Sequence, residues 1–396
     1  MPLQAKIPSP PSADLTYTLF SPSGLTKDKQ TEVRRRMLPA EWYPQSGVQL
    51  TWPHAGTDWA YILDEVTECY IRLTYEIAKR QTLLIVTPHP EDVERLLKKR
   101  LPAHITKQIR YATCPTDDTW ARDHAFLTVL TPDGPELTDF RFNGWGGKFE
   151  ASQDNAINRL LYEQSIVNGH YSNQTDFVLE GGSIESDGNG TLLTTSECLL
   201  TDTRNPHYTR AEIEERLCST FGAERILWLD HGYLAGDDTD SHIDTLARLC
   251  PGGGIAYVQC TDKTDEHYQE LRLMEEQLRT FRQADGSPYV FFPLPMPEAI
   301  YADTESGKLM TYTEAQAAKA EGKDIERLPA TYANFLILNH AVLYPTYGQS
   351  ENDEKARRVL ERAFPKYDIT GIDCRALIKQ HGSLHCVTMQ YPIGVF

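Results

Sequence analysis

Strand-like apolar runs alternate with helix-like amphipathic segments along almost the whole chain, and no long linker interrupts them. A typical stretch has a strand over 82–87, a helix over 90–101 with acidic residues in its first turn and lysines in its last, and a strand over 109–112. This rhythm predicts an α/β fold of small repeated units, although no repeat is visible in residue identity. The 396 residues could form two or three average domains, but the unbroken rhythm favours one domain over residues 34–396.

Further elements of both kinds follow the same pattern. We expect the other strands over residues 48–52, 126–130, 137–142, 177–179, 191–194, 226–228, 255–259, 289–293, 332–338, 341–344 and 384–388. We expect the other helices over residues 58–80, from 152, from 209, over 265–283 and over 351–363.

Residues 1–33 are rich in proline, serine and threonine, and we expect them to form an extension outside the domain. This segment lacks the basic start and apolar stretch of a secretory signal, and no run reaches the roughly 18 apolar residues of a membrane span. We therefore expect a soluble, cytoplasmic protein without a membrane partner. The eight cysteines show no CxxC pair and no repeated spacing, so we expect reduced thiols rather than a disulfide framework or a zinc knuckle.

The formal net charge of −17 restricts the class of partner. It disfavours nucleic acid, whose phosphates need a basic surface, and it favours the approach of small cationic molecules. Solubility alone would explain the charge equally well. A homodimer is left open.

Cys386 lies near the end of the chain in an apolar run that follows a glycine-containing turn. The run is typical of a strand, and the placement suggests a nucleophile. A free cysteine is, however, more often a buried apolar residue unless its surroundings favour the thiolate. The assignment therefore depends on partners elsewhere in the chain.

Polar clusters follow several predicted strands, at positions where loops commonly carry chemistry. One cluster places Trp120, Arg122 and Asp123 in a single short loop, and a merely solvated acidic turn would not need the tryptophan. Another places Glu180 at the end of an apolar strand before two glycines, which let the backbone approach a neighbour closely. For Glu180, a structural hydrogen-bonding role and a catalytic role are equally compatible with the sequence.

The densest group of titratable residues spans 237–244 and includes Asp238, His242 and Asp244. Such a loop could bind a divalent metal or bind and deprotonate an organic cation. Oxygen-ligand metal sites use Asp-x-Asp patterns, but the glycine and glutamate of an EF-hand loop are missing here. The glycine-rich segment over 143–148 lacks the spacing of a phosphate-binding loop.

A pocket containing Cys386, His242, Asp123, Asp244 and Glu180 would suit a guanidinium group. Two carboxylates can each accept a pair of hydrogen bonds from the planar guanidinium and hold its central carbon in front of the thiolate. His242 can protonate departing ammonia and then take a proton from water. This reaction needs no metal and no organic cofactor. A cysteine protease is the alternative, but it gives the acidic loops no role.

Eight ordered motifs resemble the agmatine deiminase and Porphyromonas-type peptidylarginine deiminase family over residues 34–396. The motifs are Pro39-Ala-Glu-Trp42, Trp120-x-Arg122-Asp123, Asn143-Gly-Trp-Gly-Gly-Lys148, Leu179-Glu-Gly-Gly-Ser183, Asp238-Thr-Asp-Ser-His242-Ile-Asp244, Pro293-Leu-Pro-Met-Pro297, Tyr332-Ala-Asn-Phe335 and His385-Cys386. The resemblance implies a pentein fold, an α/β-propeller of five pseudo-symmetric ββαβ-type units around a central active site. The sequence departs from the familiar family pattern at Ser241, Met389 and the His381-Gly-Ser turn. These departures leave the identity of the substrate undecided.

The same resemblance implies the roles of the site residues. Cys386 would be the nucleophile that forms an S-alkylthiouronium intermediate, His242 the acid and base, Asp123 and Asp244 the guanidinium-binding carboxylates, and Glu180 the residue that orients His242. Trp120, Asp238 and Asn334 would contact the substrate. Agmatine, converted to N-carbamoylputrescine and ammonia in polyamine synthesis, is the expected substrate because the pocket is rich in aspartate and poor in arginine. Deimination of peptidyl or free arginine is the second choice, and amidino transfer is the third.

Overall fold

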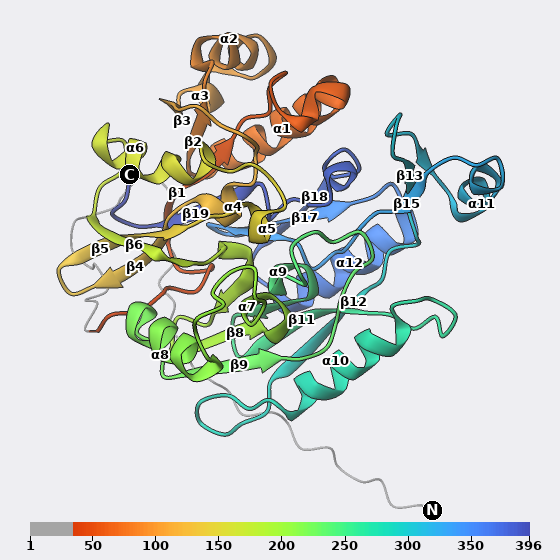
Figure 1. Cartoon of the computed structure of the whole chain (residues 1–396). Helices are drawn as coiled ribbons and strands as arrows, with labels where there is room; N and C mark the ends of the chain where they lie inside the picture. Colours follow the sequence, from red (N-terminus) through yellow and green to blue (C-terminus); the bar gives the residue numbers. More distant parts are fainter. Residues whose placement is uncertain (1–34) are drawn as a thin grey trace, which may run out of the picture.

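The computed structural model describes residues 35–396 (Figure 1). The predicted extension over residues 1–33 lies outside this described part. Among the described residues, no helix combines the length and the apolar character that a membrane crossing requires. Helices and strands alternate as expected, and the mixed α/β class predicted from the sequence is confirmed.

Five sheets share one pairing rule: the first strand runs antiparallel to the second, and the second runs parallel to the third. The repeat therefore exists in strand pairing even though it is absent from residue identity. Four of these sheets are β4(Leu127–Thr131)-β5(Gly134–Arg141)-β6(His170–Val178), β7(Ile184–Ser186)-β8(Thr191–Thr195)-β9(Arg225–Leu229), β10(Ala247–Cys250)-β11(Gly254–Gln259)-β12(Val290–Pro295) and β16(Leu336–Leu338)-β17(Ala341–Thr346)-β18(Asp368–Asp373).

The fifth sheet joins the two ends of the described chain. Its order is β19(Thr388–Pro392)-β1(Gln45–Thr51)-β2(Thr82–Thr87)-β3(Ile109–Thr113). The last strand thus pairs with the first strand, with Thr388 opposite Leu50. This pairing fixes the turn that precedes β19 against the rest of the fold.

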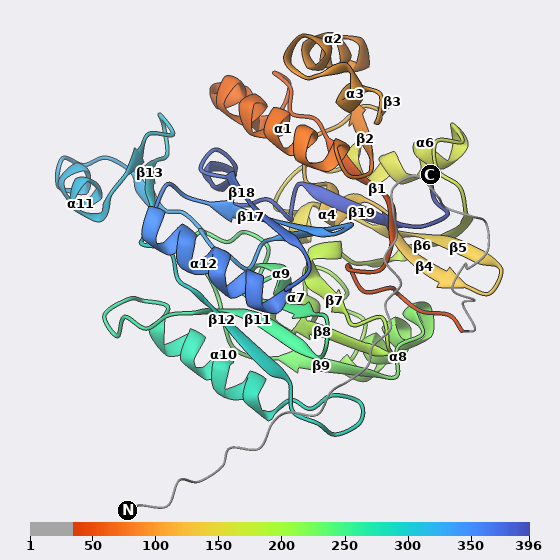
Figure 2. The same ribbon diagram turned by 180° about the vertical axis from the view of Figure 1, so that it is seen from behind.

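Most of the longer helices outside the 301–327 segment lie at the rim of the molecule in Figure 1, and Figure 2 shows the helix Ser350–Ala363 in front of the sheets. These longer helices are α1(Leu63–Ala78), α2(Pro90–Arg100), α6(Ile157–Glu163), α8(Arg210–Phe221), α10(Tyr268–Thr280) and α12(Ser350–Ala363), with the single turn α3(Ala103–Thr106) after α2. Helix α8 shows why such helices form where they do. Thr209 and Glu212 form a capping box at its start, and Gly222 ends it in the left-handed conformation.

Four short helices gather near the centre of Figure 1, where the sheets face one another. These are α4(Ala121–His124), α5(Gly144–Gly147), α7(Ser196–Leu199) and α9(Ile243–Leu246). Short 3-10 turns complete the set at η1(Asp58–Ile62), η2(Asp154–Ala156), η3(Gly181–Ser183) and η4(Leu377–Gln380). Every predicted polar cluster thus lies in or beside a short helical turn rather than in a long element.

A small additional unit, which the sequence did not predict, lies between β12 and β16. It consists of β13(Tyr301–Asp303), β14(Leu309–Met310), α11(Tyr312–Ala320) and β15(Ile325–Arg327). Its apolar residues form a separate small core that includes Tyr301, Met310 and Ile325. In Figure 1 this unit projects from the rest of the molecule.

Two predicted strands are wrong in part. Residues 384–387 form a turn, and the strand begins only at Thr388, because the backbone N–H groups of His385 and Cys386 bond to the side chain of Asn334 instead of to a neighbouring strand. The predicted strand over 332–338 is a strand only at Leu336–Leu338. In both places the residues are apolar but do not pair with a neighbouring strand, and apolar character alone therefore predicted a strand that is too long.

Candidate active site

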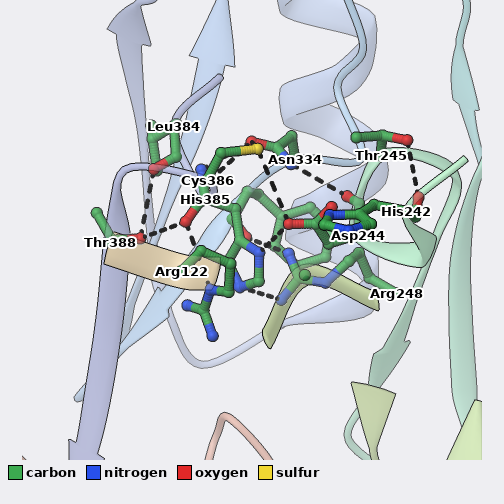
Figure 3. A network of polar contacts seen from close by, with 12 residues as sticks. Arg122, His242, Asp244, Thr245, Arg248, Asn334, Leu384, His385, Cys386 and Thr388 are labelled. Carbon is green, nitrogen blue, oxygen red and sulfur yellow. Dashed lines mark hydrogen bonds and ion pairs between the residues drawn. The ribbon is translucent and has the colours of Figure 1, made fainter. Parts of the chain in front are cut away.

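Cys386 lies in the turn between η4 and β19, with 4% of its surface exposed. Its Sγ is 3.4 Å from Oδ1 of Asn334 and 4.0 Å from Oδ2 of Asp244 (Figure 3). Oδ1 of Asn334 also accepts the backbone N–H of His385 at 2.8 Å and that of Cys386 at 3.3 Å. Asn334, predicted to contact substrate, is therefore placed where it holds the cysteine turn.

Asp123 belongs to α4 and is buried. Its Oδ1 accepts the backbone N–H of Gly182 and its Oδ2 accepts the indole N–H of Trp145, each at 3.0 Å. Trp145 reaches this position with a positive φ of 54° inside the glycine-rich segment over 143–148. That segment thus supplies a hydrogen bond to a carboxylate and not a cradle for phosphate.

His242 and Asp244 stand at the start of α9, and neither side chain is exposed. The preceding Asp240 and Ser241 both have positive φ angles, 64° and 61°, which are unfavourable for residues other than glycine. Asp237 holds this strained turn by accepting the backbone N–H of Ser241 at 2.8 Å. The turn directs the imidazole of His242 inward.

His242 lies between two carboxylates without bonding to either. Its Nδ1 is 3.7 Å from Oδ1 of Asp123, and its Nε2 is 3.9 Å from Oε2 of Glu180. Neither ring nitrogen has a hydrogen-bond partner, and the same holds for Oδ1 of Asp244. Three buried polar atoms thus remain unsatisfied at one place, which is unusual for a folded protein.

Glu180 bonds mainly to an arginine that the sequence did not reveal. Nε of Arg204 is 2.9 Å from both carboxylate oxygens of Glu180, and its NH1 is 2.6 Å from Oδ2 of Asp240. Arg204 is fully buried. It therefore ties Glu180 to the strained turn that carries His242, although its place in a loop between α7 and α8 gives no sequence signal.

A second charged layer, also missed from the sequence, lies behind Asp244. His385 contacts Oδ2 of Asp244 through Nδ1 at 2.7 Å and Oε2 of Glu41 through Nε2 at 2.8 Å. Arg248, fully buried in β10, bonds to Glu41 and Glu185. Two features of the sequence could have indicated this layer: the Pro39-Ala-Glu-Trp42 motif, which contains Glu41, and the charged Arg248 in an otherwise apolar strand.

Burial and neighbouring charges shift the pKa values of the central groups. Burial, followed by the charges of Asp244 and Asp123, raises the pKa of the Cys386 thiol well above its usual value. Burial, with Asp244 and Glu180, also raises the pKa of Asp123. Burial lowers the pKa of His242 to about 3. These shifts favour the neutral forms of the thiol and the imidazole and move Asp123 toward its protonated form.

Asp244 behaves differently from Asp123. Burial alone would raise its pKa, but the hydrogen bond and charge of His385, with His242 and Arg248, hold the pKa below its ordinary value. The two carboxylates beside the thiol thus favour opposite protonation states.

The other two predicted substrate residues, Trp120 and Asp238, form no hydrogen bond to the side chains of Cys386, His242 or Asp244 in the described part of the chain. Trp120 is buried, with its ring 5.6 Å from that of Trp59 and 6.3 Å from that of Trp145. Asp238 lies on the loop before His242, and its side chain is 43% exposed. Its Oδ2 is 3.7 Å from Nδ1 of His381, one of the residues at which the family pattern is broken.

Two clusters among the described residues bring three possible metal ligands together: Glu180 with Cys198 and His242, and Glu41 with Glu185 and His385. In each cluster a buried guanidinium already bonds to the carboxylates, that of Arg204 in the first and that of Arg248 in the second. Arginine thus supplies the positive charge that a metal ion would bring.

Comparison with known proteins places this arrangement in context. The sequence profile of the Porphyromonas-type peptidyl-arginine deiminase family matches residues 37–392. A protein of Marinomonas sp. named "Putative agmatine deiminase" is 32% identical over 363 residues, which cover 90% of this chain and 94% of the relative.

Two solved structures are similar over 91% of this chain. One is described as a putative arginine deiminase from Porphyromonas gingivalis; it is 46% identical, the match covers 100% of that chain, and the TM-score is 0.81. The other is an agmatine deiminase of C. jejuni with substrate bound; it is 34% identical, the match covers 97% of that chain, and the TM-score is 0.79.

Proposed function

The chain belongs to the Porphyromonas-type peptidyl-arginine deiminase family, and we propose that it hydrolyses the guanidinium group of agmatine to N-carbamoylputrescine and ammonia. Its membership confirms the resemblance found in the sequence. Relatives named agmatine deiminases make it a hydrolase of guanidino groups. The specific substrate and the roles of individual residues are the parts that we propose.

The observation that carries the proposal is the group of three unsatisfied atoms, both ring nitrogens of His242 and Oδ1 of Asp244. A carboxylate oxygen can only accept hydrogen bonds, and a neutral imidazole has one accepting nitrogen. Two of the three atoms therefore need a donor, and the charges of Asp244 and Glu180, which together with burial raise the pKa of Asp123, favour a cation there. A guanidinium group has five N–H donors in a plane and a permanent positive charge.

In the proposed mechanism, Asp123 and Asp244 bind the guanidinium and present its central carbon to Cys386. The positive charge of the substrate offsets the two carboxylates that disfavour the thiolate. The Sγ–C bond forms, and the tetrahedral adduct collapses when the C–N bond breaks. His242 takes the proton of the thiol as the Sγ–C bond forms and then delivers it to the departing nitrogen, so that ammonia leaves.

The second half of the reaction restores the enzyme. Water attacks the S-alkylthiouronium carbon while His242 takes one proton from it. The C–S bond then breaks to release the ureido product, and the remaining hydroxyl proton of the adduct passes to the departing sulfur and restores the thiol. Glu180, which Arg204 holds 3.9 Å from Nε2 of His242, is proposed to orient the imidazole through both steps. No step requires a metal or an organic cofactor.

Agmatine is proposed over arginine because the partly exposed carboxylate of Asp238 lies on the loop before His242, whereas the cations Lys148 and Arg204 are already paired with Asp240. An amine at the far end of the substrate suits this environment, and an α-carboxylate does not. The greater identity to a protein described as a putative arginine deiminase favours arginine deimination as the second candidate.

The five sheets with one pairing rule support a pentein propeller as the architecture of a single deiminase domain. The test of function is a colorimetric assay of ureido product with agmatine, free arginine and an arginyl peptide, each with and without EDTA. We expect the highest kcat/KM with agmatine and no effect of EDTA. If free arginine or the arginyl peptide gives a higher kcat/KM than agmatine, that compound is the substrate and the agmatine proposal is wrong.

A further inference from the structure

His385, the residue before Cys386, contacts groups on both sides of its ring. Figure 3 shows it below the cysteine, between Asp244 and Arg248. Its Nδ1 is 2.7 Å from Oδ2 of Asp244, while its Nε2 is 2.8 Å from Oε2 of Glu41 and 3.0 Å from NH2 of Arg248. The side chain is 2% exposed. These contacts connect the substrate side of the site to the charged layer behind it.

The contact with Asp244 determines which nitrogen carries hydrogen. An ionised carboxylate only accepts hydrogen bonds, so Nδ1 must be the protonated nitrogen. Nε2 faces one acceptor, Glu41, and one donor, Arg248, which also bond to each other. The Nδ1–H bond to Asp244 is therefore required by the geometry, whereas Nε2 can be satisfied in two ways.

This bond leaves the two oxygens of Asp244 unequal. Oδ2 is bonded to His385 and lies 4.0 Å from the thiol, whereas Oδ1 is buried without a partner. Asn334 restrains the same residue by donating its side-chain N–H to the backbone carbonyl of Asp244 at 3.4 Å. A carboxylate held at its backbone and at one oxygen presents the other oxygen in a fixed direction.

We infer that His385 is a positioning residue for guanidine deimination: its Nδ1–H fixes Oδ2 of Asp244 beside the thiol of Cys386 and so sets the direction in which the carboxylate meets the substrate. The inference rests on the proposed function of Asp244 as a guanidinium ligand. His385 also keeps Asp244 ionised, and Asp123 provides the contrast. Asp123 accepts hydrogen bonds from two N–H donors, but neither donor is an imidazole. The pKa of Asp123 is raised, whereas the pKa of Asp244 is lowered.

Two substitutions separate the two sides of the ring. In His385→Asn the amide nitrogen stands close to the position of Nδ1 and can still donate to Asp244. In His385→Gln it reaches the position of Nε2 and can serve Glu41 but not Asp244. Both changes remove the same ring from the same buried place, so each is the control for the other.

We expect His385→Asn to keep kcat/KM within about tenfold of the unmodified enzyme and His385→Gln to lose about 100-fold, the cost of one hydrogen bond to a buried charge. The loss should lie mainly in KM. The acid limb of the kcat/KM profile, whose start is set by Asp123, should reach its steeper lower part at higher pH in His385→Gln, because Asp244 then retains its proton longer. A purely structural role would lower the melting temperature without moving that limb.

Equal losses in the two variants, or a better His385→Gln enzyme, would overturn the inference. If neither variant folds, ¹⁵N NMR of the histidine rings in the unmodified protein decides, since a proton on Nε2 alone would contradict it. All assays use whichever of agmatine, arginine and the arginyl peptide the unmodified enzyme turns over. A failure of the agmatine proposal thus appears in the unmodified enzyme, before any variant is compared.

Discussion

A β-carbon placed on Gly182 would lie only 2.6 Å from Nδ1 of His242. It would also lie 2.8 Å from Oδ1 of Asp123 and 3.2 Å from Oδ2 of Asp244. The φ angle of Gly182 is not positive, so glycine is needed here for space and not for backbone conformation. The second glycine of the Glu180-Gly-Gly motif therefore marks the point where the imidazole and both clamping carboxylates meet.

Gly182→Ala should lower kcat/KM by at least about 100-fold, because displacing reactive groups by about 1 Å has an effect of that size. Gly286→Ala is the control. Nothing lies within 4 Å of a β-carbon at Gly286, and its φ of +84° should reduce stability by only about 1–2 kcal/mol. Steady-state kinetics and thermal unfolding distinguish the two. Normal turnover by Gly182→Ala would show that the three groups do not need this spacing.

Trp145→Phe should raise KM by about 10- to 100-fold, because it removes one N–H bond to the buried carboxylate of Asp123 while keeping an aromatic ring. Trp59→Phe is the matched control, since its indole donates to Asp118 at 2.7 Å instead. We expect that variant to change KM little. Equal KM values for Trp145→Phe and the unmodified enzyme would show that Asp123 does not bind the guanidinium of the substrate.

Arg204→Met should reduce the free energy of unfolding by about 3–5 kcal/mol, because it leaves the buried Glu180 without its partner. Adding Glu180→Gln to this variant should recover part of that stability but none of the activity. Arg159→Met, which breaks the exposed pair with Glu163, should change stability by less than about 0.5 kcal/mol. Urea unfolding measures all three. Full activity in the double variant would exclude Glu180 from the mechanism.

Substrate binding should release a proton from Asp123. Burial, Asp244 and Glu180 raise its pKa in the empty site, and a bound guanidinium favours the ionised form. The affinity of Cys386→Ser for agmatine should therefore rise with pH between the pKa of Asp123 in the complex and its higher value in the free protein, and stay constant outside that window. Asp244, whose pKa is already lowered, adds nothing to this rise.

Titration calorimetry of Cys386→Ser in two buffers of different ionisation enthalpy measures this proton. The serine removes the thiol as a competing proton source. Asp123→Asn in the same background should bind weakly and without pH dependence. A buffer-independent enthalpy, together with constant affinity from pH 5 to 9, would show that Asp123 is ionised before substrate arrives.

The sequence predicted the fold best where local pattern decides it. Helices such as α2 and strands such as β2 follow from periodicity, acidic first turns and basic last turns. The short strands β7, β10 and β18 were missed, because three to six residues with mixed polarity show no clear alternation. In the unit from Tyr301 to Arg327 the same reason applies to the strands, which have two or three residues each, whereas the helix Tyr312–Ala320 was missed because it buries only Ala315 and Ala318.

The candidate site was predicted as a set of acids, a histidine and a cysteine, and the structure brings Asp123, Glu180, His242, Asp244 and Cys386 together. Their counter-charges were not predicted. Arg204, Arg248 and Glu41 act through contacts with residues 24 to 344 positions away, as in the pairs Arg204–Glu180 and Glu41–His385. Local sequence carries no record of such partners, and burial of an arginine cannot be read from its neighbours.

The central claim is that Cys386 attacks the guanidinium carbon, and mass spectrometry of enzyme quenched in acid during turnover of agmatine tests it most directly. The expected result is a peptide containing Cys386 whose mass has increased by that of agmatine less ammonia, as the thiouronium requires. The adduct should be absent from Cys386→Ser. Continued turnover with no adduct on Cys386, or an adduct on another cysteine such as Cys198, would contradict the account.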